Sequence, residues 1–184
     1  MEALTQWELE LLHRFAEWGG RGWEVFWTFI TGFGDAGIFW IDLSLALMIP
    51  KKTRKAGFSM GLALLIGVIV GNGILKNVFH RIRPYHLDPE LCHRLAWGEM
   101  SKDFSFPSGH TLASWEAATA LFLHHKKSGI CAMVLAFLIS VSRLFLLVHY
   151  PSDVLCGALL GIGFAFFAAW AVGILWNRYE QRFV

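Results

Sequence analysis

Two long stretches without charge are the feature that most constrains how this chain can fold. Residues 56–75 and 154–176 contain no Asp, Glu, Lys or Arg over 20 and 23 consecutive positions. A helix of about 20 apolar residues is long enough to cross the hydrocarbon core of a bilayer. Only 16% of the chain is charged and 55% is hydrophobic, whereas soluble domains average about a quarter charged residues. The sequence therefore predicts an integral membrane protein.

Shorter apolar runs supply the other expected crossings. Residues 111–123, interrupted by Glu116, and residues 130–148, interrupted by Arg143, are each read as one crossing. Residues 23–33 and 38–50 are shorter, so they form short or re-entrant helices or combine into one crossing. Glu116, and Asp42 in the last run, are expected to make polar contacts or to line a cavity. We expect an all-α fold, a polytopic transmembrane bundle of about five or six helices, forming one domain over residues 1–184.

The N-terminal segment has an amphipathic pattern, unlike the uniformly apolar crossings. Residues 4–18 place apolar side chains at helical spacing and include Trp7 and Trp18. An amphipathic helix with tryptophans at headgroup depth lies in the membrane interface, so we assign residues 1–22 to an interfacial helix. This segment carries four Glu and is not typical of a cleavable signal peptide.

Loop charges predict the orientation. The basic loop at residues 51–55, the Lys126-Lys127 turn and the tail with Arg178 and Arg182 are each separated by two crossings, so they share a face. The positive-inside rule makes that face cytoplasmic. Three polar clusters, at residues 76–84, 107–110 and 143–153, then fall on the outer side, with the mixed polar residues 85–106 as a loop or short helix over them.

The first cluster contains Lys76 and Arg83. These residues are seven positions apart, so they share a face if the helix continues to Pro84, whereas Arg81 faces solvent or headgroups. Such cations hold a phosphate, or they extend toward lipid phosphates at the interface.

The second cluster is Pro107-Ser108-Gly109-His110, which resembles a helix start. Free backbone N–H groups and the helix dipole there favour anion binding, and Gly109 lets an anion approach the backbone. The alternative is an ordinary helix cap with an incidental histidine.

The third cluster joins Arg143, His149 and Asp153. A spacing of four residues allows Asp153 to accept a hydrogen bond from one ring nitrogen of His149, which leaves the other nitrogen as a nucleophile. Asp153 also has an alternative role as a helix N-cap. A metal site is a rival reading of the histidines, but their spacings match no common zinc pattern and the neighbouring cations repel a metal. Those histidines are His80, His86, His93, His110 and His149.

Together, Lys76-x6-Arg83-Pro84, Pro107-Ser108-Gly109-His110 and Ser142-Arg143-x5-His149-x3-Asp153 resemble the three-part signature of the type 2 phosphatidic acid phosphatase superfamily. The resemblance covers residues 76–153 and none of residues 1–55. It implies a helical membrane phosphatase that uses no metal or cofactor and forms a phosphohistidine. It implies catalytic roles for His149 as nucleophile, Asp153 as its orienting partner and His110 as acid and base. The implied phosphate-binding residues are Lys76, Arg83, Ser108, Gly109 and Arg143.

The expected function is removal of phosphate from a lipid phosphate or diphosphate at the outer face of a bacterial plasma membrane. Undecaprenyl diphosphate is the preferred substrate by analogy with small members of the family. Phosphatidic acid, phosphatidylglycerophosphate and diacylglycerol diphosphate are alternatives. A non-catalytic lipid-phosphate binding or transport protein is the alternative of another class. A net charge of +2 does not favour a nucleic-acid partner. Cys92, Cys131 and Cys156 have no metal spacing, and Cys131 and Cys156, which lie within apolar runs, are interpreted as packing residues.

Overall fold

The computed structural model describes residues 2–18, 21–94 and 101–183, and these residues form helices and no strand. The helices of the N-terminal half are α1 (Glu2–Glu17), α2 (Arg21–Gly32), η1 (Asp35–Gly37), α3 (Ile38–Met48), α4 (Arg54–Ile66), η2 (Gly67–Leu75) and α5 (Lys76–Phe79). The remainder are α6 (Pro84–Leu87), α7 (Pro89–His93), α8 (Gly109–His124), α9 (Lys126–Phe145) and α10 (Pro151–Phe183). The expected all-α class is confirmed.

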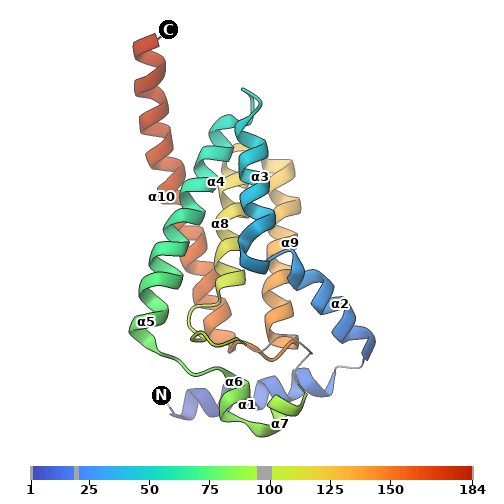
Figure 1. Cartoon of the computed structure of the whole chain (residues 1–184). Coiled ribbons are helices and arrows are strands. Elements are labelled where there is room, and N and C mark those ends of the chain that lie inside the picture. The colour runs from blue at the N-terminus through green and yellow to red at the C-terminus, as the bar shows by residue number, and fades with distance from the viewer. Residues whose placement is uncertain (1, 19–20, 95–100, 184) are drawn as a thin grey trace.

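The long helices α3, α4, α8, α9 and α10 run side by side, while α1, α6 and α7 lie across one end of the bundle (Figure 1). Helix α8 is central and contacts α3, α4, α9 and α10. The connections from α3 to α4 and from α8 to α9, and the C-terminal end of α10, lie at the opposite end. The basic residues 51–55 and Lys126-Lys127 are therefore separated from the three polar clusters by the length of the bundle.

In the part of the chain that the structure describes, four helical segments have the length and composition to cross a membrane: Gly22–Met48, Arg54–Leu87, Lys126–Phe145 and Pro151–Arg178. Helix α8 has 16 residues, which is short for a lipid-facing crossing. Its side chains are largely buried among the neighbouring helices. A central helix does not need a continuous apolar surface, so Glu116 is tolerated within α8.

The N-terminal third combines its two short runs into one interrupted segment. Helices α2 and α3 are joined at η1, where Ala36 and Gly37 adopt left-handed backbone angles, φ 49° and 69°. Helix α2 slants away from the bundle axis, whereas α3 runs parallel to α4 (Figure 1). Residues 19 and 20, within the segment assigned to the interfacial helix, and residues 95–100 of the expected loop lie outside the described residues.

The helix that begins at Arg54 does not continue to Arg83 as predicted. It widens into π-helical turns over Gly67–Leu75 and ends at Phe79, because His80 takes a left-handed conformation with φ 46°. The next residues are extended, and Pro84 begins α6 instead of ending the long helix. Lys76 and Arg83 therefore do not share a helix face, and a different geometry brings them together.

Helices α8 and α10 make a close contact through a glycine. A Cβ atom on Gly161 would lie 2.7 Å from the carbonyl oxygen of Leu112 and 3.0 Å from Cβ of Trp115. A Cβ atom on Gly163 would meet nothing within 4 Å. The absence of a side chain at Gly161 thus sets the distance between the two helices that carry Ser108, His110 and Asp153.

We predict that Gly161→Ala destabilises the protein by about 1–3 kcal/mol, because the new methyl group must push apart two packed backbones. Thermal unfolding in detergent would measure the loss, with Gly163→Ala as the matched control on the same helix. Equal midpoints for the two variants would contradict the close contact.

Candidate active site

Lys76 and Arg83 meet at one carboxylate that the sequence did not single out. Lys76 Nζ donates to Asp103 Oδ2, and Arg83 Nη2 donates to Asp103 Oδ1 at 2.6 Å. Arg83 Nε also donates to the main-chain oxygen of Asp103 at 3.1 Å. The extended chain after His80 turns Arg83 back toward Lys76, which remains on the helix. The two cations therefore converge as predicted, although not on one helix face.

Asp103 occupies the position where an anionic ligand would meet these cations. Partial burial alone would raise the pKa of Asp103, but hydrogen bonds from Lys76 and Ser101 and the charge of Arg83 hold it well below its usual range. The Asp103 side chain is 45% exposed, whereas those of Lys76 and Arg83 are 10% and 5% exposed. Two charge-assisted donors directed at one pair of oxygens are also the geometry that recognises a phosphate.

Arg83 links this cation pair to His149. Its Nη1 donates to the main-chain oxygen of Val148 at 2.9 Å and lies 3.3 Å from His149 Nε2. On the other side of the ring, His149 Nδ1 lies 3.5 Å from Asp153 Oδ2. Burial lowers the pKa of His149 to about 3, although the hydrogen bond that its ring donates to Asp153 acts in the opposite direction. The imidazole is therefore neutral at ordinary pH, with Nδ1 toward the carboxylate and Nε2 toward Arg83.

Asp153 is fully buried and joins several segments of the chain. Its Oδ2 accepts from Ser105 Oγ at 2.5 Å and from the Tyr150 N–H at 3.1 Å. Its main-chain oxygen accepts from the Ser108 N–H at 3.2 Å, which connects the second and third polar clusters. Asp153 thus combines a side-chain position beside His149 with a backbone contact to the start of α8.

The expectation that Arg81 faces solvent or headgroups is wrong. Its Nη1 donates to Asp153 Oδ1 at 2.5 Å and to Ser152 Oγ at 2.6 Å, and its Nη2 donates to Glu8 Oε2 at 2.6 Å. Its guanidinium carbon lies 3.9 Å from the centroid of the Tyr150 ring. The end of the helix at Phe79 changes the direction of Arg81, so its side chain turns into the site.

His110 stands at the first turn of α8, one residue after Gly109, and its Nε2 lies 2.8 Å from Asp35 Oδ1. Ser108 is the residue that precedes the helix, as expected, but its buried hydroxyl is 3.0 Å from Thr111 Oγ1. A Cβ atom on Gly109 would lie 3.1 Å from Asn72 Oδ1, so the helix start packs closely against η2.

Arg143 is buried near the end of α9, where its Nη1 donates to Thr31 Oγ1 of α2. This contact ties α2 to the third cluster. The extended loop between α9 and α10 then begins, and Leu147 adopts a left-handed conformation with φ 60° just before His149.

The sequence did not predict the contacts that several residues make in the site: Glu8, Thr31, Asp35, Arg81, Asp103 and Ser105. Asp35 had a usable signal, because a carboxylate between Gly34 and Ala36-Gly37 marks a turn next to an apolar run. Asp103 and Ser105 precede the helix-start motif closely enough to have been considered with it. Glu8 had no such signal, since its spacing resembles that of any acidic residue on an amphipathic helix.

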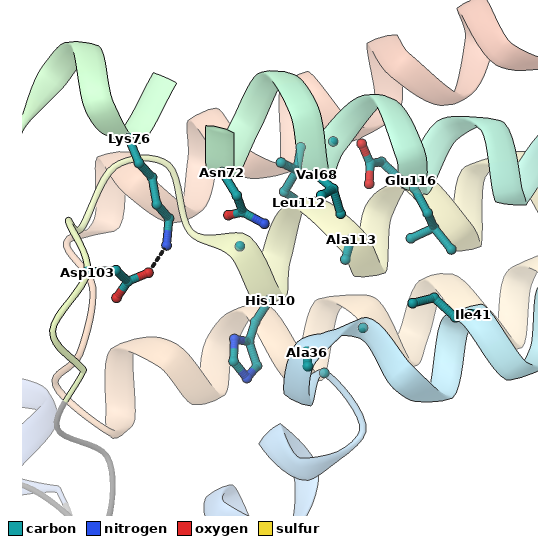
Figure 2. A pocket seen from close by; sticks show the side chains of 15 residues that line it. Ala36, Ile41, Val68, Asn72, Lys76, Asp103, His110, Leu112, Ala113 and Glu116 are labelled. Carbon is teal, nitrogen blue, oxygen red and sulfur yellow. Dashed lines mark hydrogen bonds and ion pairs between the residues drawn. The ribbon is translucent and has the colours of Figure 1, made fainter. Parts of the chain in front are cut away.

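A pocket of about 220 Å³ runs from this site along α8 (Figure 2). Lys76, Asp103 and His110 lie at one end, and Glu116 lies toward the other, between η2, α3 and α8. The wall between them is mostly apolar, with Ile41, Leu64, Val68, Leu112 and Ala113 among its residues. Glu116 is 1% exposed, and its Oε1 has no hydrogen-bond partner. Asp42, by contrast, is exposed on α3.

Within the described residues, no group of three His, Cys, Asp or Glu side chains has an arrangement that could hold a metal ion. Cys92, Cys131 and Cys156 are free thiols.

Comparison with known proteins identifies the family. Residues 55–177 match the model of the PAP2 superfamily. The chain belongs to the PAP2 superfamily. The match covers all three polar clusters, and it confirms the resemblance noted in the sequence. This chain is therefore an integral membrane protein of a phosphatase family.

Individual relatives agree with this assignment. The chain is 33% identical to an undecaprenyl-diphosphatase of Sulfolobus acidocaldarius over 141 residues, which cover 76% of this chain and 66% of that relative. It is 35% identical over 156 residues to the bacitracin transport permease protein BcrC of Bacillus licheniformis, covering 77% of this chain and 75% of that one. The crystal structure of a PAP2-type phosphatidylglycerolphosphate phosphatase from Bacillus subtilis has the same fold, with a TM-score of 0.74 and 23% identity. That alignment covers 100% of this chain and 89% of the other.

We predict that Asp103→Asn strengthens inhibition by inorganic phosphate about two- to fivefold, because a half-exposed carboxylate no longer competes for Lys76 and Arg83. The inhibition constant in detergent would measure this effect, with Glu90→Gln, at an exposed position of α7, as the control. Weaker inhibition by phosphate in Asp103→Asn would show that Asp103 supports anion binding instead of competing with it.

Proposed function

We propose that this protein hydrolyses a lipid phosphate or diphosphate through a phosphohistidine, with undecaprenyl diphosphate as its preferred substrate. The observation that carries the proposal is the environment of His149. Its Nδ1 faces the buried Asp153 carboxylate, and its Nε2 faces the cation Arg83, which also binds the anion position beside Lys76. His149 therefore has the candidate orienting carboxylate on one side of its ring and a candidate phosphate-binding cation on the other.

The chemistry proceeds in two displacements. Nε2 of His149 attacks phosphorus, and the bond from phosphorus to the leaving oxygen breaks while His110 gives that oxygen a proton. Water then attacks the phosphohistidine, gives its proton to His110, and releases inorganic phosphate as the bond from phosphorus to nitrogen breaks. Asp153 stabilises the positive charge that develops on the imidazole during the first step.

The cations supply the charge stabilisation that phosphoryl transfer requires. Lys76, Arg83 and Arg143 would hold the phosphoryl oxygens, assisted by Ser108 and the Gly109 N–H at the start of α8. A metal ion is not part of this proposal, because three cations around one phosphate position would repel it. Asp35 would keep His110 oriented through its contact with Nε2.

The pocket supports a lipid substrate. Ile41 and Val68 line it and are also exposed on the outside of the bundle, 43% and 57% respectively. The pocket therefore reaches the lipid-facing surface, and an apolar chain can lie along it with its phosphate at Lys76. An isoprenoid diphosphate, the kind of substrate named for the Sulfolobus relative, has an apolar chain that suits this apolar wall.

The orientation also belongs to the proposal. The basic loop at residues 51–55 and Lys126-Lys127 lie at the end opposite the site (Figure 1), and the positive-inside rule makes that end cytoplasmic. The site then faces outward from a bacterial plasma membrane, and the chain acts as one domain over residues 1–184. A cysteine placed at position 90 and labelled only from the cytoplasmic side would contradict this orientation.

A glycerophospholipid phosphate is a second candidate, and Glu116 favours it. A carboxyl group in an apolar pocket is held as the neutral acid, since a buried unpaired charge is costly. Its O–H can donate to an ester carbonyl, which phosphatidic acid and phosphatidylglycerophosphate carry and an isoprenoid chain does not. Gly67 makes room for Glu116, because a Cβ atom there would collide with the carboxyl group.

A non-catalytic binding or transport protein is the alternative of another class, and one relative is named a transport permease. Binding a phosphate needs the cations alone. It does not need a neutral His149 paired with Asp153, nor His110 in the pocket that Lys76 lines, so these features support catalysis.

We expect His149→Ala to lower turnover of a lipid phosphate at least about a thousandfold, since no other group takes the role of nucleophile. Wild-type activity should be unchanged by EDTA. Phosphate release from purified protein in detergent measures both. Full activity in His149→Ala, or loss of wild-type activity in EDTA that added metal restores, would refute the corresponding part of the mechanism.

We expect a panel of lipid phosphates to place undecaprenyl diphosphate first in kcat/KM. Glu116→Leu should lower the kcat/KM for phosphatidic acid about fivefold relative to undecaprenyl diphosphate, because one hydrogen bond to the ester is lost. Glu116→Gln retains a donor and is the matched control. A wild-type preference for phosphatidic acid or phosphatidylglycerophosphate would establish the second candidate instead.

A further inference from the structure

The N-terminal helix α1 lies outside the part of the sequence that matches the family model, yet it contributes a residue to the polar network of the site. Residues 55–177 match the PAP2 model, and α1 covers Glu2–Glu17. It nevertheless lies across the end of the bundle where the site is (Figure 1), and it contacts α7 and α9. The family model does not include this helix, so its contacts in this chain indicate its role.

Two contacts fix α1 in this position. Leu12 is fully buried in a small apolar cluster with Leu91, Leu147 and Tyr150. Two members of that cluster, Leu147 and Tyr150, flank His149 in the loop between α9 and α10. His13 Nε2 also lies 2.7 Å from Asp88 Oδ2, ahead of α7. The helix thus packs directly against the loop that carries the nucleophile.

Glu8 is the residue of α1 that enters the polar network. It is 1% exposed, its Oε2 accepts from Arg81 Nη2 at 2.6 Å, and its Oε1 accepts from the Ser152 N–H at 2.8 Å. Arg81 in turn donates to Asp153 at 2.5 Å. A chain of hydrogen bonds therefore runs from Glu8 through Arg81 to the carboxylate beside His149.

The charges along this hydrogen-bonded chain suggest a purpose for Glu8, the second carboxylate that contacts Arg81. Arg81 alone would neutralise Asp153 and weaken its support for the positive imidazole that forms during attack on phosphorus. Glu8 balances Arg81, so the group of three carries a net charge of −1 while Arg81 still fixes the direction of the Asp153 oxygens. Glu8 also holds the first turn of α10 through Ser152.

We propose that Glu8 is a positioning residue, which acts through Arg81 to orient Asp153 and to keep its negative charge effective at His149. This rests on the proposed function, because it assumes that His149 and Asp153 act as the nucleophile and its partner. Glu8 does not touch the substrate, so its loss should slow the chemical step without weakening substrate binding.

Glu8→Gln should lower kcat between about tenfold and hundredfold, as expected for a displaced catalytic group, with KM changed less than about twofold. The substrates are undecaprenyl diphosphate and phosphatidic acid in detergent micelles, and thermal unfolding is measured on the same samples. Glu10→Gln is the matched control, because Glu10 is exposed on the same helix. A kcat equal to that of Glu10→Gln would overturn the proposal.

A double-variant cycle separates this role from a merely structural one. If Glu8 acts through Arg81, Glu8→Gln combined with Arg81→Gln is at least as active as Arg81→Gln alone. An additive loss would show that Glu8 acts independently of Arg81 and would overturn the proposal. His149→Ala tests the underlying mechanism separately. If His149→Ala is inactive but Glu8→Gln equals wild type, only the role of Glu8 fails.

Discussion

The hydrogen bonds that satisfy the buried carboxylate of Asp153 are the interactions on which the rest of the site depends. A charge removed from water at the edge of an apolar bundle is costly unless cations and hydrogen-bond donors surround it. Arg81, Ser105 and the Tyr150 N–H supply these donors from three parts of the chain. Satisfying this one group therefore fixes the loop after α9, the extended segment after α5 and the loop before α8. The geometry around His149 follows from that requirement.

The sequence predicted the all-α membrane fold and the contact between His149 and Asp153, because both depend on short-range chemistry. Uncharged stretches identified the long helices, because crossing a bilayer depends on length and polarity. The pairing of His149 with Asp153 follows from their separation of four residues. The contacts of Arg81 and Asp103 were not predicted, because they depend on where a helix ends. A single left-handed residue, His80, redirects the chain there, and nothing in its sequence neighbourhood marks that turn.

Helix α8 shows how burial changes the meaning of a sequence pattern. By length and composition it is not among the segments that qualify as membrane spans, and it contains Glu116. Its neighbours α4, α9 and α10 surround it, so its side chains contact protein instead of lipid. Small residues such as Gly161 then matter more than hydrophobicity, since they set how closely α10 can approach. This arrangement places the start of α8 beside Asp153.

The pocket between η2, α3 and α8 has a consequence for the direction of the proposed reaction. Its apolar length reaches the lipid-facing surface at Ile41 and Val68, while its polar end lies where the bundle meets water. The two products would leave by different routes, the shortened lipid sideways into the bilayer and the inorganic phosphate into solution. Once they have entered separate phases, their re-encounter at His149 becomes rare. This separation would slow the reverse step at the site, while the equilibrium constant of the reaction stays the same.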